Sequence, residues 1–589
     1  MFNYSVPIKD MVTIYESLMK DNPELEILGI PKFSNQSLNK LLLDAEKFAQ
    51  DKLVPINAVG DREPSFLENG VVRTPPGFKE AYDQYTKEGW IGLTCEKEHG
   101  GEGLPKTISG FIDEIWSSSN LSFKLFSELT IGAYNCIYHN AKDEIRELYL
   151  PKMARGDWGG TMCLTEEQCG TDLGLIKTLA TPVNEKTYSV QGQKIYITSG
   201  DQDLTENVIH LVLAKTPNAP EGTKGLSLFL VPKIKINQDG SLGDRNNVRA
   251  SHVFDKMGIR GVPTCAIEFD NAEGILIGNL NEGLKSMFIM MNIERIKVGL
   301  HGLGLSEVAF QQALSFSKSR KQGRNNEKDP LDGTAIINHP DIKRQLLTMK
   351  SLIEGERALA FWLSIQTDLS LKEKNLKKKE DASDLVALMT PVVKSFFTDL
   401  GSELTSLAIQ IHGGRGYMKN FYLDQFYRDN RITSIYEGTN AIQALDLIYR
   451  KIGNSKNDII QKFFDLIENE INCTPTNSDF YDLSVILKNY LQKMSAFTTW
   501  LRDKLQNKVD DARAGASDFQ LALGYLSVGY VWVKFLNKLD PGNDIYKDKL
   551  DTAKFYFSRI LTRIDLHYQN AKEGSDLMMD FQFKDNKYN

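Results

Sequence analysis

The sequence predicts a mainly α-helical protein with a β-rich middle region, because the spacing of its apolar residues changes along the chain. Between about residues 35 and 157 the apolar residues recur with the period of a helix. Between about 161 and 280 the apolar runs become short and β-rich, with turn residues between them. From about 283 to 450 long helical periods return. We therefore expect a helical region, a β region and a second helical region, in that order.

The N-terminal helical region is represented by Leu41–Ala49, and a Gly- and Pro-rich interruption is expected between 55 and 78. The middle region contains short β-rich runs separated by turns such as Asn237–Ser241. Four strands are expected there, at Tyr188–Ile197, Val208–Ala214, Leu226–Val231 and Ala266–Phe269.

The C-terminal half is predicted to be helical. Its most apolar stretch is Met287–Val298, and the lysine-rich stretch Lys372–Asp381 is expected to be a solvated loop between helices. The tail starts with a helix that has one apolar face, and Asp518–Phe535 and Leu550–Leu566 show the same helical pattern. That face consists of Ile459, Ile460, Phe463, Phe464, Ile467 and Ile471. The tail is therefore predicted to be a further helical domain without a catalytic constellation.

Composition indicates a soluble globular protein of several domains. The chain has 589 residues, of which 41% are hydrophobic and 25% charged, and its net charge of −7 favours neither nucleic acid nor an anionic membrane as partner. Six cysteines form no CxxC pair and no metal-like spacing, so reduced thiols and no metal are expected. No secretion signal and no apolar run of about 18 residues is recognised, so we expect a cytoplasmic protein without an integral membrane segment.

The segment Ile435–Gln443 places one carboxylate where a base could act. Glu437 stands between an aromatic residue and a glycine, just before a helix start. Asn440 is predicted to cap that helix, with Gln443 completing a capping box. A carboxylate on such a turn, shielded by Tyr436 and a ligand, would have a raised pKa and suit a general base. The alternative is an ordinary glutamate in a capping turn.

Several motifs in the expected order resemble the acyl-CoA dehydrogenase family. Besides Ile435–Gln443, they are Gly89–Leu93, Gly100–Leu104, Leu164–Asp172, Lys194–Thr198, Lys224–Pro232, Gln410–Tyr417 and Arg428–Ile432. Three further segments, Tyr4–Met11, Val59–Glu63 and Thr74–Tyr82, resemble a subfamily with an extra C-terminal helical region. That subfamily includes enzymes named as 3-methylmercaptopropionyl-CoA dehydrogenases and broad fatty acyl-CoA dehydrogenases.

The resemblance implies a fold and a division into domains. The fold is an N-terminal α domain, a β-barrel-like middle domain, a four-helix bundle and a helical tail. The corresponding ranges are 1–34 for an N-terminal extension, 35–160, 161–282, 283–452 and 453–589.

The implied reaction is the α,β-dehydrogenation of an acyl-CoA. No side chain can accept a hydride, so the resemblance implies that FAD takes it from the β-carbon. Glu437 is the implied base for the α-proton, and the turn at Gly438 would supply a backbone N–H to the thioester oxygen. Tyr436 and Arg295 are implied to contact the substrate. Glu294 is the alternative base, because a minority of the family carries its base at that position.

The family's flavin contacts are transferred position by position. They are Leu164, Thr165, Gly170, Thr171, Tyr196, Thr198, Arg320, Gln322, Gly323, Gln410, Gly413, Gly414 and Thr439. Two departures stand out: many relatives have Trp where Tyr196 stands, and Pro-Gly-Ala where this chain has Glu167-Gln168-Cys169. Cys169 is expected to be a small buried hydrophobic residue.

Partners and alternatives follow from the same resemblance. Electron-transfer flavoprotein is the expected acceptor, and a homodimer is the expected assembly. An acyl-CoA oxidase, a related flavin monooxygenase or nitroalkane oxidase, and a degenerate non-catalytic relative remain alternatives, although the intact Tyr436–Thr439 turn argues against the monooxygenases. The length of the acyl chain is left open.

Overall fold

The computed structural model describes residues 2–20, 34–324, 333–454 and 457–583. The chain forms two compact units, and the division between them falls within helices α3 (Asn35–Phe48) and α8 (Gly283–Ser319). Unit 1 comprises Met1–Val6, Leu42–Val308 and Gly414–Thr433. Unit 2 comprises Pro7–Leu41, Ala309–Gly413 and Ser434–Asn589. The predicted N-terminal extension, 1–34, lies partly outside the described residues.

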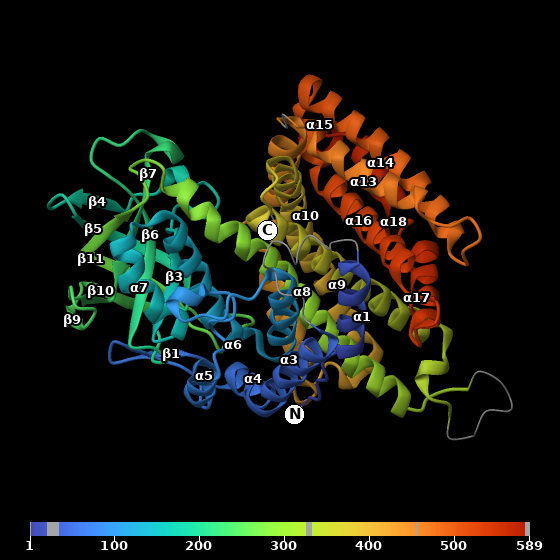
Figure 1. Ribbon diagram of the computed structural model, residues 1–589, viewed down its shortest axis with the longest axis horizontal. Coiled ribbons are helices and arrows are strands. Elements are labelled where there is room, and N and C mark those ends of the chain that lie inside the picture. The colour runs from blue at the N-terminus through green and yellow to red at the C-terminus, as the bar shows by residue number, and fades with distance from the viewer. Residues whose placement is uncertain (1, 21–33, 325–332, 455–456, 584–589) are drawn as a thin grey trace, which may run out of the picture. The chain divides into compact units, whose positions relative to one another are not determined.

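Unit 1 begins with the predicted helical region (Figure 1). Besides its parts of α3 and α8, its helices are α4 (Val54–Arg62), α5 (Phe78–Lys87), α6 (Lys106–Asn140), α7 (Asp143–Arg155) and, much later in the chain, α11 (Leu423–Arg431). The interruption expected between 55 and 78 begins later than predicted, because α4 continues to Arg62; a hairpin of β1 (Phe66–Glu68) and β2 (Val71–Arg73) follows. Asn69 and Gly70, both with positive φ, form the hairpin turn, as an Asn-Gly pair favours.

The β region of unit 1 forms a barrel-like sheet. Its strands are β3 (Trp158–Cys163), β4 (Leu179–Pro182), β5 (Thr187–Thr198), β6 (Asn207–Lys215), β7 (Leu226–Pro232), β10 (Val248–Val253) and β11 (Thr264–Ile277). Strands β8 (Ile234–Ile236) and β9 (Leu242–Arg245) pair separately. The main sheet follows the order β10-β11-β5-β4-β6-β3, and β7 joins β6 to β11. This extra pairing closes a ring of five strands, which confirms the predicted β-barrel-like middle domain.

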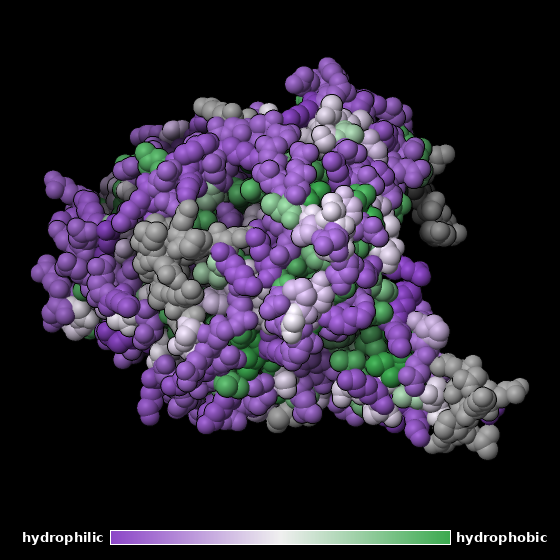
Figure 2. All heavy atoms as spheres, turned by 45° about the vertical axis from the view of Figure 1, so that its right-hand side comes forward, coloured by the Kyte–Doolittle hydropathy of each residue, from purple (hydrophilic) through white to green (hydrophobic). Residues whose placement is uncertain are grey.

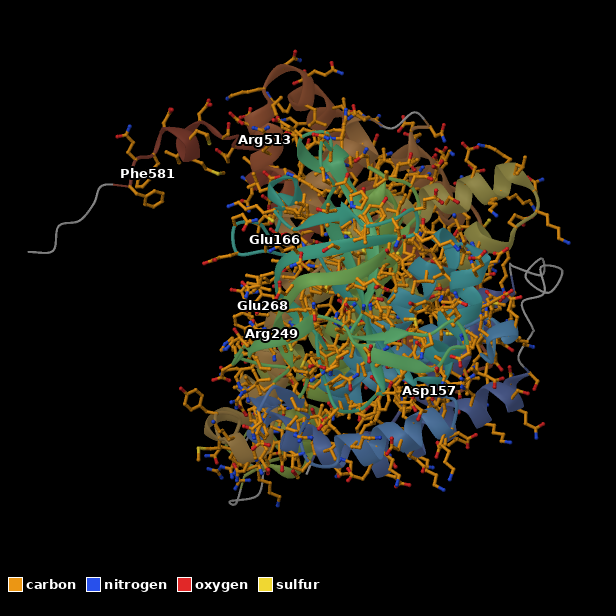
Figure 3. The ribbon with its side chains drawn as sticks, turned by 90° about the vertical axis from the view of Figure 1, so that its left-hand side faces the viewer. Asp157, Glu166, Arg249, Glu268, Arg513 and Phe581 are labelled. Atoms are coloured by element: carbon orange, nitrogen blue, oxygen red, sulfur yellow. The ribbon has the colours of Figure 1, made fainter. Side chains whose placement is uncertain are left out.

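The core of the barrel-like sheet is apolar. Val190, Val212, Phe229 and Ile267 are fully buried inside it and come from four different strands. The four strands predicted from sequence are confirmed as parts of β5, β6, β7 and β11, each of which extends beyond the predicted range. Charged residues lie on the outer surface of the sheet, as Arg249 and Glu268 on the neighbouring strands β10 and β11 illustrate (Figure 3).

Unit 2 is helical. Besides the ends of α3 and α8 it contains α1 (Ile8–Met19), α9 (Pro340–Lys372), α10 (Leu376–His412), α12 (Asn440–Asp446), α13 (Ile459–Asn472), α14 (Tyr481–Asn507), α15 (Val509–Ala514), α16 (Ala516–Lys538), α17 (Tyr546–Arg559), α18 (Arg563–Lys572) and α19 (Asp576–Asp580). The fold class, mainly α with a β middle domain and extra C-terminal helices, is therefore confirmed.

Helix α16 lies in the core of unit 2. It is the one helix of the described residues whose length and composition would allow it to cross a membrane, although no apolar run of that length was recognised from the sequence. Of its most apolar 18-residue window, 89% is buried inside the protein, against α9, α10 and α14 among others. Figure 2 shows a largely hydrophilic surface on the visible face, with hydrophobic residues in small separate areas.

Two predicted tail patterns are confirmed, the apolar face of α13 and the helix at Asp518–Phe535, while a third tail pattern and one loop before the tail are corrected. All six residues of the predicted apolar face of α13 are buried. The predicted helix Leu550–Leu566 is interrupted after Arg559, because the chain turns there and buries Ile560 and Leu561. The loop predicted at Lys372–Asp381 is shorter than expected: α10 begins at Leu376, since the Asn375 side chain caps its first backbone N–H groups.

Candidate functional site

Glu437 lies on a tight turn that precedes α12. The φ angles of Glu437 and Gly438 are +56° and +84°, so two successive residues are in the left-handed region. A residue with a Cβ atom pays for this conformation with roughly 1–3 kcal/mol of strain and keeps it only where its surroundings enforce it. The Glu437 side chain is half-buried. The turn therefore holds a carboxylate in a strained and partly shielded position.

The predicted helix cap is wrong by one residue. Thr439 is the N-cap of α12, and its hydroxyl accepts a hydrogen bond from the Ile442 N–H at 3.3 Å. Asn440 cannot cap because its side chain is committed elsewhere, accepting from Lys394 Nζ at 2.8 Å and donating to Asp399 at 2.7 Å. Gln443 does not complete a capping box, since its Nε2 donates to the carbonyl oxygen of Glu437 at 3.0 Å.

Lys394 contacts this turn from α10, and sequence reasoning missed it. Its side chain is fully buried, and Nζ donates to the carbonyl oxygen of Gly438 at 2.8 Å. A lysine between the apolar pairs Val392-Val393 and Phe396-Phe397 is the signal that could have found it, because an isolated charge in a buried helix needs a specific partner.

In unit 1 the predicted flavin-side loop follows β3. Leu164 is buried, and the backbone of Thr165 accepts a hydrogen bond from the Ile195 N–H at 2.9 Å. Glu166 and Cys169 pair through both of their backbone groups at 3.0 Å, which places Glu167 and Gln168 at the exposed tip of a turn. Cys169 is buried, as expected.

The same loop is tied to β5 by a buried ion pair that sequence reasoning did not identify. Lys194 Nζ lies 2.8 Å from the Glu166 carboxylate and also donates to the Leu164 carbonyl at 2.9 Å. The carboxylate accepts further hydrogen bonds from the backbone N–H groups of Lys177 and Thr178 at 2.7 and 3.0 Å. Burial acts to raise the pKa of Glu166, but the attraction of Lys194 and these hydrogen bonds outweigh it and lower the pKa to about 2. The Glu166 carboxylate, labelled in Figure 3, is therefore charged at neutral pH and joins β5 to the backbone of 177 and 178.

Tyr196 projects from a β-bulge in β5. Two residues of β5, Ile195 and Tyr196, stand opposite Ala266 alone, and Tyr196 has a φ of +58°. Its side chain is 59% exposed and contacts the ring of Phe254 at a centroid distance of 4.7 Å. Gly170 and Thr171 are exposed, and Thr198 is half-buried. The structure thus brings the loop and the Tyr196 strand together and leaves an aromatic face and loop groups accessible.

Glu294 and Arg295 lie on α8 in a buried, charged environment. Glu294 is 2% exposed and lies 3.6 Å from Lys297. Burial opposes the charge of Lys297, but Glu294, Asp113 and Glu128 together raise the pKa of Lys297 above its usual value. Arg295 is also buried, with its guanidinium 5.9 Å from the centre of the Phe288 ring. Glu294 therefore lies beside a cation of the same helix.

The remaining predicted flavin contacts lie at the ends of two helices. Arg320 and Gln322 follow α8 and are exposed, in a segment whose backbone pairs with 334–336. Gln410 and Gly413 lie at the end of α10, and Gly414 follows them, with open space around both glycines. The rings of Phe316 and His412 stack at 4.3 Å, which brings the two helix ends together.

The Arg428–Ile432 motif has a structural role within unit 1. Arg428 donates to both carboxylate oxygens of Asp61 at 2.7 Å, which ties α11 to α4. Asp429 is buried and accepts a hydrogen bond from the Ile259 N–H. Burial raises the pKa of Asp429 to about 7 against that hydrogen bond, and the Asp61 carboxylate adds to the rise. A pocket of about 190 Å³ beside this tie contains none of the predicted site residues.

We expect Asp429 to make the stability of the protein depend on pH. Its pKa is higher in the folded than in the unfolded protein, so its contribution is complete below about pH 3.8 and is lost as pH rises through 7. The slope is at most about 1.4 kcal/mol per pH unit. Urea unfolding between pH 5 and 8 should show a smaller decline for Asp429→Asn than for the wild type. An Asp255→Asn variant, which alters an exposed carboxylate, serves as the control, and parallel curves for all three proteins would refute this assignment.

Comparisons with known proteins match four family models to successive parts of the chain. Family models for the acyl-CoA dehydrogenase N-terminal, middle and C-terminal domains match residues 36–157, 161–272 and 281–452. A model described as acetyl-CoA dehydrogenase C-terminal like matches 460–582.

Among the described residues, no group of three or more His, Cys, Asp or Glu side chains could hold a metal ion.

Individual relatives cover nearly the whole chain. The 3-methylmercaptopropionyl-CoA dehydrogenase of Ruegeria pomeroyi is 36% identical over 98% of this chain and 99% of its own. Two solved structures share the fold. ACDH-11 of Caenorhabditis elegans in complex with C11-CoA has a TM-score of 0.80, with 20% identity over 98% of this chain and 96% of its own. An acyl-CoA dehydrogenase of Bacillus anthracis complexed with FAD has a TM-score of 0.74, with 21% identity over 94% and 90% of the two chains.

Proposed function

The chain belongs to the acyl-CoA dehydrogenase family, and we propose that it oxidises an acyl-CoA to the trans-2-enoyl-CoA with Glu437 as the base. The observation that carries this proposal is the Glu437 turn, which holds a half-buried carboxylate in a left-handed conformation. Strained backbone of this kind is concentrated at functional sites, because the surrounding structure must maintain it.

FAD is the cofactor, and the residues of unit 1 fit it. The exposed Gly170 and Thr171 offer backbone N–H groups and a hydroxyl for polar contacts, while Tyr196 and Leu164 offer apolar surface. The ion pair of Glu166 and Lys194 fixes the loop that carries Gly170 and Thr171. When bound, the flavin supplies an acceptor for the β-hydride, which no side chain of the chain can provide.

The chain's own residues supply the proton chemistry. The Glu437 carboxylate takes the α-proton, and the backbone N–H groups of its turn are the candidates to stabilise charge on the thioester oxygen. Tyr436, Gly438 and Arg295 are assigned to the bound acyl-CoA. Thr439 and the exposed Arg320, Gln322, Gln410, Gly413 and Gly414 are assigned to the diphosphate and adenosine side of FAD.

Glu437 is a better base than Glu294. Glu294 is almost fully buried and is paired with Lys297, which belongs to a network that includes Glu128 and Asp113. The Glu294 carboxylate is therefore shielded from solvent and held beside a cation of the protein itself. Glu437 is half-buried, so a bound acyl group could complete its shielding from solvent.

The proposed assembly is a homodimer. The proposed electron acceptor is electron-transfer flavoprotein. Relatives named for methylthio-acyl and linear acyl substrates leave the chain length open. The test is an anaerobic titration of the yellow protein with butyryl-, octanoyl-, dodecanoyl-, palmitoyl- and methylthiopropionyl-CoA.

We expect at least one of these thioesters to bleach the flavin and to yield the 2-enoyl-CoA. The pattern across the series assigns the chain-length class. Absence of bleaching with all five would refute the dehydrogenase proposal. Reoxidation in air with rapid peroxide formation, and without need of electron-transfer flavoprotein, would replace it with an acyl-CoA oxidase.

A further inference from the structure

The turn that carries Glu437 is held by hydrogen bonds to two successive carbonyl groups. The Glu437 carbonyl accepts from Gln443 Nε2 at 3.0 Å, and the Gly438 carbonyl accepts from Lys394 Nζ at 2.8 Å. Both donors are fully buried side chains. Because each carbonyl belongs to one rigid peptide plane, the two donors restrain the planes on both sides of the Gly438 Cα atom.

This arrangement is costly for stability. A lysine ammonium on the buried part of a helix loses its hydration, and an apolar residue of similar volume would avoid that cost. Gln443 adds a second cost, since its Oε1 is buried and accepts no hydrogen bond within the described part of the chain. An unsatisfied buried acceptor loses its hydration without compensation. Because Lys394 and Gln443 lower stability in this way, they indicate a function at the turn rather than a role in packing.

The task follows from the conformation of Glu437. Its left-handed backbone is strained, so the turn would relax if its carbonyls lost their donors. Relaxation would move the carboxylate relative to a bound thioester, and a misplacement of about 1 Å can lower a rate about 100-fold. Asn440 reinforces the contact, because its Oδ1 accepts from the same Lys394 Nζ and its Nδ2 donates to Asp399.

We propose that Lys394 and Gln443 are positioning residues, which hold the Glu437 turn in its left-handed conformation and so direct the carboxylate toward the α-carbon of the acyl-CoA. This inference rests on the proposed role of Glu437 as the base. Neither residue is assigned a contact with the substrate or FAD. Their loss should therefore slow proton removal while leaving acyl-CoA and FAD binding nearly unchanged.

The test uses the FAD-loaded enzyme with Lys394→Met and, separately, Gln443→Met, and all rates are expressed per bound flavin. We expect kcat to fall about 10- to 100-fold in each variant, with KM for the acyl-CoA changed by less than about threefold. Lys549→Met is the matched control. Lys549 is a buried lysine of unit 2 that pairs with Asp10 and Glu354, so its loss should lower the melting temperature and leave kcat within about twofold.

A second readout follows proton removal without oxidation. An acyl-CoA with sulfur in place of its β-methylene group has an acidic α-proton but no β-hydrogen, so the base can deprotonate it and no hydride can leave. Its anion beside oxidised flavin gives a long-wavelength charge-transfer absorption. We expect Lys394→Met to weaken this band, and the Lys394→Gln variant, which keeps a shorter donor, to recover part of it. The band of Lys549→Met should match the wild type.

The double variant Lys394→Met/Gln443→Met should lose less activity than the product of the single effects, because both residues act through one turn. Wild-type kcat in both single variants, or an equal loss of kcat in Lys549→Met, would overturn the inference. A Glu437→Gln enzyme measured alongside separates the two proposals. Full flavin reduction in that enzyme refutes Glu437 as the base, whereas its inactivity beside fully active Lys394 and Gln443 variants refutes the positioning role alone.

Discussion

Replacing Glu437 by Gln is expected to lower the rate of flavin reduction by acyl-CoA by up to about 10⁴-fold, the range over which a positioned general base accelerates proton transfer. Glutamine keeps the size of the side chain and the backbone of the turn, but its amide cannot accept a proton at neutral pH. Anaerobic stopped-flow mixing with a bleaching thioester measures this rate directly. The FAD content should not change, because Glu437 is assigned no contact with the cofactor.

Glu294→Gln is the matched control for this experiment. It makes the same chemical change at the alternative base, which is buried on α8 and paired with Lys297. We expect its rate of flavin reduction to stay within about tenfold of the wild type, while its melting temperature falls because Lys297 loses a carboxylate partner. The reverse result, an active Glu437→Gln and an inactive Glu294→Gln, would transfer the role of base to Glu294.

The second large effect is expected from Lys194→Met. This change leaves the Glu166 carboxylate buried without its cation, and breaking a buried ion pair from one side costs about 3–5 kcal/mol. Lys194 also holds the Leu164 carbonyl, so the loop assigned to FAD should lose its fixed conformation. We expect a lower urea midpoint and a purified protein with much less bound FAD than the wild type.

An ion pair on the surface of the same sheet provides the control for Lys194→Met. Arg249 lies 2.6 Å from Glu268, but its side chain is 78% exposed (Figure 3). Because solvent screens such pairs, Arg249→Met should change stability by less than about 1 kcal/mol and leave FAD binding intact. If Lys194→Met were as stable and as rich in FAD as Arg249→Met, the role assigned to the buried pair would be wrong.

The sequence and the structure agree best where a signal is local. The short β-rich runs at 188–197 and 208–214 predicted strands that the structure contains, and the glycine after Glu437 predicted a tight turn. The cap of α12 was assigned to Asn440 instead of Thr439, because both residues can cap and the choice depends on Lys394, which occupies the Asn440 side chain. The length of the lysine-rich loop was overestimated because charge composition does not mark where a helix begins.

By itself the sequence determined the order of helical and β regions, the motifs of the family and the candidate base, because periodicity, turn residues and motif spacing are properties of short segments. Only the tertiary structure decided which side chains support that base and its cofactor loop. Lys394 is 44 residues from Gly438, and Lys194 is 28 residues from Glu166. Such pairs form when separate helices or strands pack together, and their energy depends on burial, which no short segment of the sequence specifies.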